Sequence, residues 1–144
     1  MNILEKIAAV KREEVKSRKI TNPVSVLERS AFFDRKMPSF HEALAKPAPS
    51  VIGEFKRKSP SRGDINTGAG ITEVALGYQK AGIAAMSVLT DEVFFGGRNS
   101  DLQEIAGLLT IPVLRKDFVV DEYQVIEAKS IGAGAILLIA SILT

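Results

Sequence analysis

Acid–base chemistry in this sequence falls mainly to lysine and carboxylate side chains. The chain has no cysteine and one histidine, His41. This composition excludes disulfides and thiolate zinc sites, and it excludes catalysis built on several histidines. The remaining proton donors and acceptors are Lys, Asp, Glu and Tyr. We expect no chemical role for His41, which lies in a short helical segment.

Two of these residues lie in a segment that is predicted to be a strand. Glu54 and Lys56 belong to the run 51–56, and alternate residues of a strand point to the same face. A carboxylate inside a buried strand is costly unless it is paired, so Glu54 is a candidate functional residue. We interpret Arg57 and Lys58, which follow the strand, as the start of a solvated loop.

Apolar runs and helical patterns alternate from residue 49 onward. Strands are predicted near 51–56, 84–89, 112–116 and 135–139, with helices between them whose N-caps we assign to Thr72 and Ser100. This alternation is typical of a parallel sheet with right-handed crossovers. An open doubly wound sheet and a (βα) barrel both fit the pattern, and both place active sites at the carboxyl ends of strands. The run 112–116 ends there in Arg115 and Lys116, and Asp117 follows directly.

Helical segments precede this alternation. Residues 2–19 have amphipathic spacing, and Pro23 and Ser39 each begin a further short helix. We interpret the charge run 11–19 as a solvated face. The sequence therefore predicts a helical extension over residues 1–48, followed by the α/β part over residues 49–144.

Composition limits the class of partner. Hydrophobic residues make up 46% and charged residues 25% of the chain, which excludes disorder of the chain as a whole. A net charge of +2 gives no indication of a nucleic-acid partner. No apolar run is long enough for a membrane span, and the N-terminus lacks the apolar core of a signal peptide. We therefore expect a cytoplasmic protein.

The strand segments together resemble one enzyme family. The segment from Val51 to Ser61 closely resembles the signature of indole-3-glycerol-phosphate synthase, and its Glu-x-Lys-x-x-Ser-Pro-Ser block is the most specific part. The resemblance continues, in order, at 87–91 and Phe95, at 113–118 and at 135–144. Gly53 is a small departure, because the pattern has Ala there. The resemblance implies a TIM barrel and a decarboxylating lyase of tryptophan biosynthesis that uses no metal or other cofactor.

The resemblance also implies roles for particular residues. Lys116 is similar to the general acid that activates the substrate carbonyl, and Lys56 to the cation that holds the anthranilate carboxylate. Glu54 is similar to the carboxylate tied to these lysines and to the dehydration step. The implied substrate is a phosphorylated anthranilate derivative, 1-(2-carboxyphenylamino)-1-deoxyribulose 5-phosphate. Its contact positions are Ser59, Phe95, Phe118, Leu137 and Leu89.

Length is the feature that does not fit a complete barrel. The chain has 144 residues, whereas an eight-stranded barrel typically needs roughly 200 or more. We therefore expect the first half of a barrel, inactive alone, because the family takes a second Glu, an Asn and the phosphate-binding loops from later strands. Two alternatives stay open. One is a non-catalytic half-barrel module that self-associates or pairs through its open edges, and the other is a different phosphate-handling TIM barrel.

Overall fold

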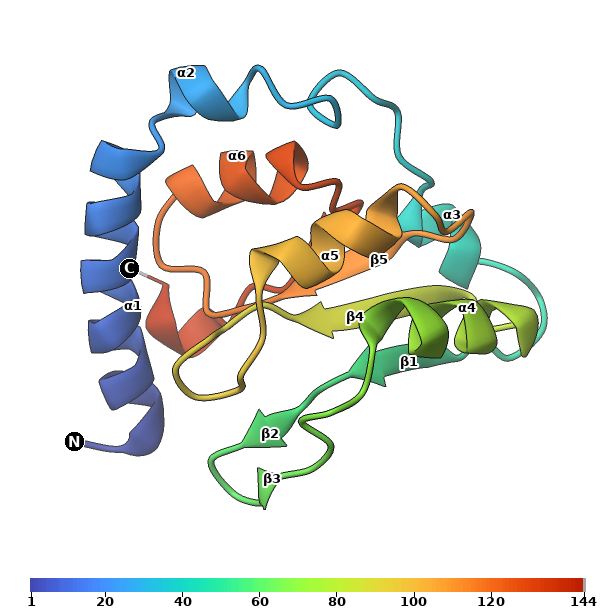
Figure 1. Cartoon of the computed structure of the whole chain (residues 1–144), viewed down its shortest axis with the longest axis horizontal. Helices are drawn as coiled ribbons and strands as arrows, with labels where there is room; N and C mark the ends of the chain where they lie inside the picture. Colours follow the sequence, from blue (N-terminus) through green and yellow to red (C-terminus); the bar gives the residue numbers. More distant parts are fainter. Residues whose placement is uncertain (144) are drawn as a thin grey trace.

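Four parallel strands form the main sheet of the computed structural model, which describes residues 1–143 (Figure 1). Thr144, the last residue of the predicted α/β part, lies outside the described residues. The strands lie in the order β1 (Ile52–Phe55), β4 (Ala85–Leu89), β5 (Val113–Lys116) and β6 (Ala135–Ile136). The helices α4 (Ile71–Lys80), α5 (Asn99–Ala106) and α6 (Tyr123–Ser130) connect them.

The arrangement of strands and helices distinguishes the two architectures that the sequence leaves open. Each strand of the main sheet lies beside the one that precedes it in the chain, so the strand order never reverses. The core cluster joins α4, α5 and the end of α6 to the same side of β4 and β5. A doubly wound sheet would reverse its order and carry helices on both faces. The described sheet therefore fits part of a barrel.

The core lies between the sheet and these helices. Phe55, Met86 and Val88 point toward the helices and pack against Leu102 and Ile105 of α5, and all five are buried. Strand alternation sends the neighbouring residues to the opposite face. This second face receives Glu54, Ser87 and Lys116, so it is where chemistry can occur.

The N-terminal residues form an extension that stands across one end of the sheet. Helix α1 (Ile3–Thr21) begins with a capping box between Asn2 and Glu5. Figure 1 shows α1 at the end toward which the arrows of β1 and β4 point, which is the carboxyl end of the strands. The short helices α2 (Val24–Leu27) and α3 (Phe40–Leu44) follow, and the Ser39 hydroxyl caps α3 as predicted.

Several local predictions were wrong. The fourth strand covers Ala135–Ile136 and not 135–139, and within residues 1–143 it pairs with β5 alone. The segment after β1 contains an unpredicted hairpin of β2 (Lys58–Ser59) and β3 (Gly63–Asp64). Thr72 and Ser100 are not N-caps, because their helices begin at Ile71 and Asn99. The Thr72 hydroxyl instead hydrogen-bonds to Glu104.

Gly97 is required by a close approach of two backbone segments. A Cβ atom on Gly97 would overlap the carbonyl group of Leu89, at the end of β4. Gly77, inside α4, has no atom within 4 Å of the corresponding position. The two glycines therefore form a matched pair for substitution by alanine.

We expect Gly97→Ala to lower the free energy of unfolding by about 2 kcal/mol, because the new methyl group forces the end of β4 to move. Gly77→Ala should raise it by about 0.5–1 kcal/mol, because alanine is the better helix former. Urea unfolding followed by circular dichroism measures both. Equal effects of the two substitutions would contradict the close approach at Gly97.

Candidate active site

A carboxylate lies between two lysines at the carboxyl ends of the strands. Lys116 Nζ donates a hydrogen bond to Glu54 Oε2 at 2.8 Å, and Lys56 Nζ lies 3.8 Å from Glu54 Oε1. Ser87 Oγ donates to Glu54 Oε2 at 3.1 Å. The strand register explains this cluster, because Glu54 pairs with Ser87 and Leu89 with Lys116 on the face away from the helices.

The three charged groups stay partly open to solvent. The side chains of Glu54, Lys56 and Lys116 are 29%, 34% and 39% exposed. Two cations and one carboxylate leave the cluster with an excess positive charge. Such a cluster can bind an anionic ligand and can donate a proton to it.

A pocket of about 140 Å³ opens beside this cluster. Its walls are mainly apolar, and the rings of Phe95 and Phe118 lie 5.8 Å apart at 36° to each other. Leu89 and Leu137 complete the predicted set, and Asp117 and Ile139 also line the pocket. A pocket lined by aromatic rings and charged groups suits a flat ring that carries a charged substituent.

A larger groove lies at the other end of the sheet. It has a volume of about 460 Å³ and is lined by residues at the amino ends of the strands, such as Val51, Ala84 and Pro112. Glu42 and Lys46 are its charged residues, and it contains none of the predicted site residues. We therefore place the candidate site at the carboxyl ends, where the paired lysines and carboxylate are.

Ser59 differs from the other predicted site residues. It lies in β2, and its hydroxyl accepts a hydrogen bond from the backbone N–H of Arg62 at 3.2 Å. It does not line the pocket in the described residues. A substrate contact by Ser59 stays a prediction.

The interpretation of Arg57 as a solvated residue was wrong. Its guanidinium forms a two-point ion pair with Asp101 at the start of α5, in which Nη2 donates to Oδ1 at 3.0 Å. It also stacks over the ring of Phe55, with the guanidinium carbon 4.8 Å from the ring centre. These contacts hold the backbone directly after Lys56 and so help to fix the direction of that lysine.

The interpretation of residues 11–19 as a solvated face was also wrong at Lys11. Its ammonium is fully buried and lies 2.8 Å from Asp91 Oδ2 and 3.1 Å from Asp117 Oδ1. Arg115 is buried as well, and its Nη2 atom lies 2.7 Å from Glu127 Oε2 and 3.5 Å from Asp117 Oδ2. Two buried cations thus contact the carboxylate next to Lys116.

These contacts keep Asp117 ionised. Burial alone would raise the pKa of the Asp117 carboxyl, but Lys11 and Arg115 lower it, as do hydrogen bonds from Thr90 and from the Phe118 N–H. The net effect is a pKa below the ordinary value. Burial would also lower the pKa of Lys11, but the carboxylates of Asp117, Asp91 and Glu14 outweigh it and raise the pKa above its usual range.

Sequence reasoning missed Lys11, Asp91 and the Arg57–Asp101 pair. A signal for Lys11 was present, because it lies four residues from both Ile7 and Val15 and so on the buried face of α1. Asp91 and Asp117 each stand just beyond the end of a predicted strand. No local pattern indicates that one lysine meets both of these carboxylates.

Neither a metal centre nor a membrane segment emerges from residues 1–143. They contain no group of three or more His, Asp or Glu side chains placed to hold a metal ion. No helix among them has the length and apolar character that crossing a membrane requires.

The fold and the site together define a class of protein. A parallel sheet of consecutive βα units with a Lys–Glu–Lys cluster at its carboxyl ends is typical of a barrel enzyme that works by acid–base chemistry. The family model described as indole-3-glycerol phosphate synthase matches residues 4–144. The chain belongs to the indole-3-glycerol phosphate synthase family, which confirms the resemblance inferred from the strand motifs.

Individual relatives agree with this assignment. The chain is 44% identical to an indole-3-glycerol phosphate synthase of Endomicrobium trichonymphae, over 99% of the chain and 56% of the relative. It is 45% identical to one of Burkholderia vietnamiensis over the same shares, and 44% identical to one of Caldanaerobacter subterraneus over 98% and 54%. The chain therefore spans about half the length of the curated relatives that it matches.

The buried Asp117 makes stability depend on pH. We expect Asp117→Asn to lower the free energy of unfolding at pH 7 by about 3 kcal/mol, because it breaks a buried ion pair. The contribution of Asp117 is complete above the pKa of an unfolded aspartate, about 3.9, and is lost as the pH falls through the lower folded value. The difference between wild type and variant should therefore shrink below about pH 4.

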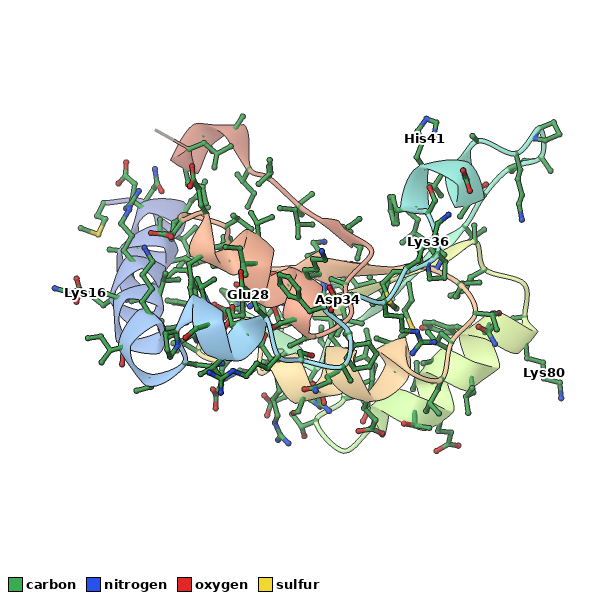
Figure 2. All side chains as sticks on the ribbon, turned by 90° about the horizontal axis from the view of Figure 1, so that it is seen from above. Lys16, Glu28, Asp34, Lys36, His41 and Lys80 are labelled. Atoms are coloured by element: carbon green, nitrogen blue, oxygen red, sulfur yellow. The ribbon has the colours of Figure 1, made fainter. Side chains whose placement is uncertain are left out.

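Chemical denaturation at a series of pH values measures this difference. Asp34→Asn is the control, because Asp34 is exposed (Figure 2) and its removal should change stability by less than about 0.5 kcal/mol. A difference for Asp117→Asn that stays constant down to about pH 2 would contradict a buried, ionised carboxylate.

Proposed function

We propose that this chain supplies the Lys–Glu part of the active site of an indole-3-glycerol phosphate synthase that works in the cytoplasm. The reaction closes the pyrrole ring of 1-(2-carboxyphenylamino)-1-deoxyribulose 5-phosphate with loss of carbon dioxide and water. One observation carries the proposal. Of the residues that the resemblance assigns to the site, all but Ser59 line the same small pocket, although they come from separate segments of the chain.

Lys116 is the proposed general acid. Ring closure needs a proton at the ketone oxygen of the substrate while the aromatic carbon attacks the carbonyl carbon. Lys116 lines the pocket and its side chain is 39% exposed, so a ligand can reach it. Its hydrogen bond to Glu54 holds the ammonium in place.

Lys56 is the proposed partner of the anthranilate carboxylate. An ammonium beside the apolar pocket can hold that carboxylate until it leaves as carbon dioxide. Glu54 balances part of the charge of the two lysines, and its carboxylate can accept a proton during the later loss of water. We thus assign to Lys116, Lys56 and Glu54 the roles in charge binding and proton transfer that this segment can supply.

Phe95, Phe118, Leu89 and Leu137 are the proposed contacts of the aromatic ring. The two phenylalanine rings offer a flat, apolar surface that fits the anthranilate moiety better than a sugar. This contact would place the carboxylate of the anthranilate ring beside Lys56. The ketone of the substrate's deoxyribulose chain would then point toward Lys116.

We further propose that the described sheet is the first half of an eight-stranded barrel. The edge strands β1 and β6 expose apolar side chains near their ends, among them Val51, Ile52 and Leu138. Further strands would cover these edges in a barrel. The polypeptide of residues 1–144 would then lack the later strands and the groups that the family draws from them.

The exposed edges also favour a second candidate, which is a module that assembles with itself or with a complementary half. Open strand edges next to apolar side chains invite pairing. Sedimentation of the purified chain separates this candidate from the first. A compact monomer over a range of concentrations would contradict self-assembly.

We expect Lys116→Met, in a full-length synthase that carries this segment, to lower kcat by about 10²–10⁴-fold, because a positioned general acid contributes that much. Lys80→Met is the matched control, because Lys80 projects from α4 into solvent (Figure 2) and should leave kcat unchanged. Steady-state kinetics on the carboxyphenylamino-deoxyribulose phosphate measure both. A loss of less than about tenfold for Lys116→Met would reject Lys116 as the acid.

The polypeptide of residues 1–144 by itself should turn over this substrate at least about 10³-fold more slowly than a full-length relative, because the proposed site is incomplete in it. Indole-3-glycerol phosphate formation under identical conditions measures the ratio. Turnover close to that of the relative would show that these residues suffice, and would contradict the half-site account.

A further inference from the structure

A fully buried ammonium group has no part in the proposed reaction. Lys11 lies on α1, and its side chain is 0% exposed. Its Nζ atom lies 2.8 Å from Glu14 Oε2 on the same helix, 2.8 Å from Asp91 Oδ2 and 3.1 Å from Asp117 Oδ1. Burying a lysine is costly unless its charge is paired. The three carboxylates supply that pairing, so the question is what the buried ion cluster does for the fold or the site.

The two aspartates come from separate loops that both lead into the pocket. Asp91 follows β4, and its Oδ1 atom accepts hydrogen bonds from the backbone N–H groups of Phe94 at 2.7 Å and Phe95 at 3.2 Å. Asp117 follows β5, and its Oδ1 atom accepts from the N–H of Phe118 at 2.8 Å. Each carboxylate therefore contacts Lys11 and also holds the backbone of an aromatic wall of the pocket.

We propose that Lys11 is a positioning residue for the aromatic pocket, in which one ammonium on the N-terminal helix ties together the loops that carry Phe95 and Phe118. The rings of Phe95 and Phe118 lie 5.8 Å apart in the described structure. Their spacing follows from the backbone positions that Asp91 and Asp117 fix. The identity of the ring that the pocket takes rests on the proposed function, whereas the tie itself does not.

The charge states support this link. Burial alone would lower the pKa of Lys11, but Asp117, Asp91 and Glu14 together raise it, so the ammonium stays charged at neutral pH. Asp91 Oδ2 has no hydrogen-bond donor at a good angle among the described residues, although Lys11 lies 2.8 Å away. The ammonium is thus the charge partner of this oxygen, and its loss would leave the carboxylate uncompensated.

Helix α1 has a separate attachment, so Lys11 is not needed merely to hold the helix. The Tyr123 hydroxyl donates to the carbonyl oxygen of Asn22 at 2.7 Å, just after the end of α1. Val15 packs in a buried cluster with Leu27 and Tyr123. A variant that loses the Lys11 tie should therefore keep α1 in place while the two loops loosen.

The test uses the double variant Lys11→Met/Asp91→Asn. Removing Lys11 alone would leave buried carboxylates without their partner, which endangers folding. The double variant removes one charge of each sign, and the side-chain amide introduced at position 91 can still accept the hydrogen bonds of Phe94 and Phe95 through its oxygen. Lys16→Met is the matched control on the same helix, because Lys16 is 76% exposed and points away from the molecule (Figure 2).

Two readouts are measured on the chain of residues 1–144. Amide hydrogen exchange, resolved by NMR, reports the loops at Phe95 and Phe118 and, as an internal control, the buried helix α5 at Ile105. Anthranilate fluorescence then reports binding of this probe to the pocket, and the chain has no Trp to interfere.

We expect exchange at Phe95 and Phe118 to become about tenfold faster in the double variant, the size expected for a lost charge-assisted contact. Exchange at Ile105 and all values for Lys16→Met should stay within about twofold of wild type. Anthranilate should bind the double variant at least about fivefold more weakly, because the aromatic walls no longer hold their spacing.

Unchanged exchange at Phe95 and Phe118 would overturn the proposal. A uniform acceleration that includes Ile105 would also overturn it, because Lys11 would then be a general stabiliser of the fold. Faster exchange confined to the two loops would support the proposal even where wild type itself fails to bind anthranilate. In that case the positioning role stands, and the proposed function is what fails.

Discussion

The site depends on one constraint, which is that the Asp117 carboxylate is buried directly beside Lys116 and must be paired with cations. Lys11 and Arg115 meet this need, one from the N-terminal helix and one from the same strand end. Arg115 in turn pairs with Glu127 of α6. The ends of β4 and β5, helix α6 and helix α1 are therefore joined through one ionic network, to which α1 contributes the buried Lys11.

The neighbouring residues Arg115 and Lys116 have different functions, because Arg115 belongs to this network and Lys116 to the candidate active site. Strand alternation sends Arg115 toward the helices, where it is buried, and Lys116 to the other face, where it meets Glu54. The buried face is fully paired and fixes the backbone, whereas the Lys–Glu–Lys cluster stays partly open and keeps an excess positive charge. A group that donates a proton to a ligand needs this combination, in which the backbone is rigid and the acid itself remains accessible.

Much of this arrangement could be predicted from the sequence, and the rest depends on tertiary contacts. Near-continuous apolar runs located β1, β4 and β5 to within one residue at each end, and the family motif brought together Glu54, Lys56 and Lys116. The shortness of β6 could not be predicted from its sequence, because strand length there depends on the neighbouring strand. Lys11 was misinterpreted because a run of charges on a helix is usually solvated. Its partners lie 80 and 106 residues away in the chain, so no local sequence pattern indicates that they contact Lys11.

The central claim is that Glu54, Lys56, Lys116 and the two phenylalanines form one binding site for the anthranilate derivative. NMR of the chain with labelled lysine and phenylalanine side chains tests it most directly, in a titration with the reduced substrate analogue whose ketone is replaced by an alcohol. We predict that the resonances of Lys56, Lys116, Phe95 and Phe118 shift together with a single dissociation constant, while Lys46 in the groove at the opposite end of the sheet does not shift. Shifts confined to Lys46 and its surroundings, or the absence of shifts at both Lys56 and Lys116, would contradict the account.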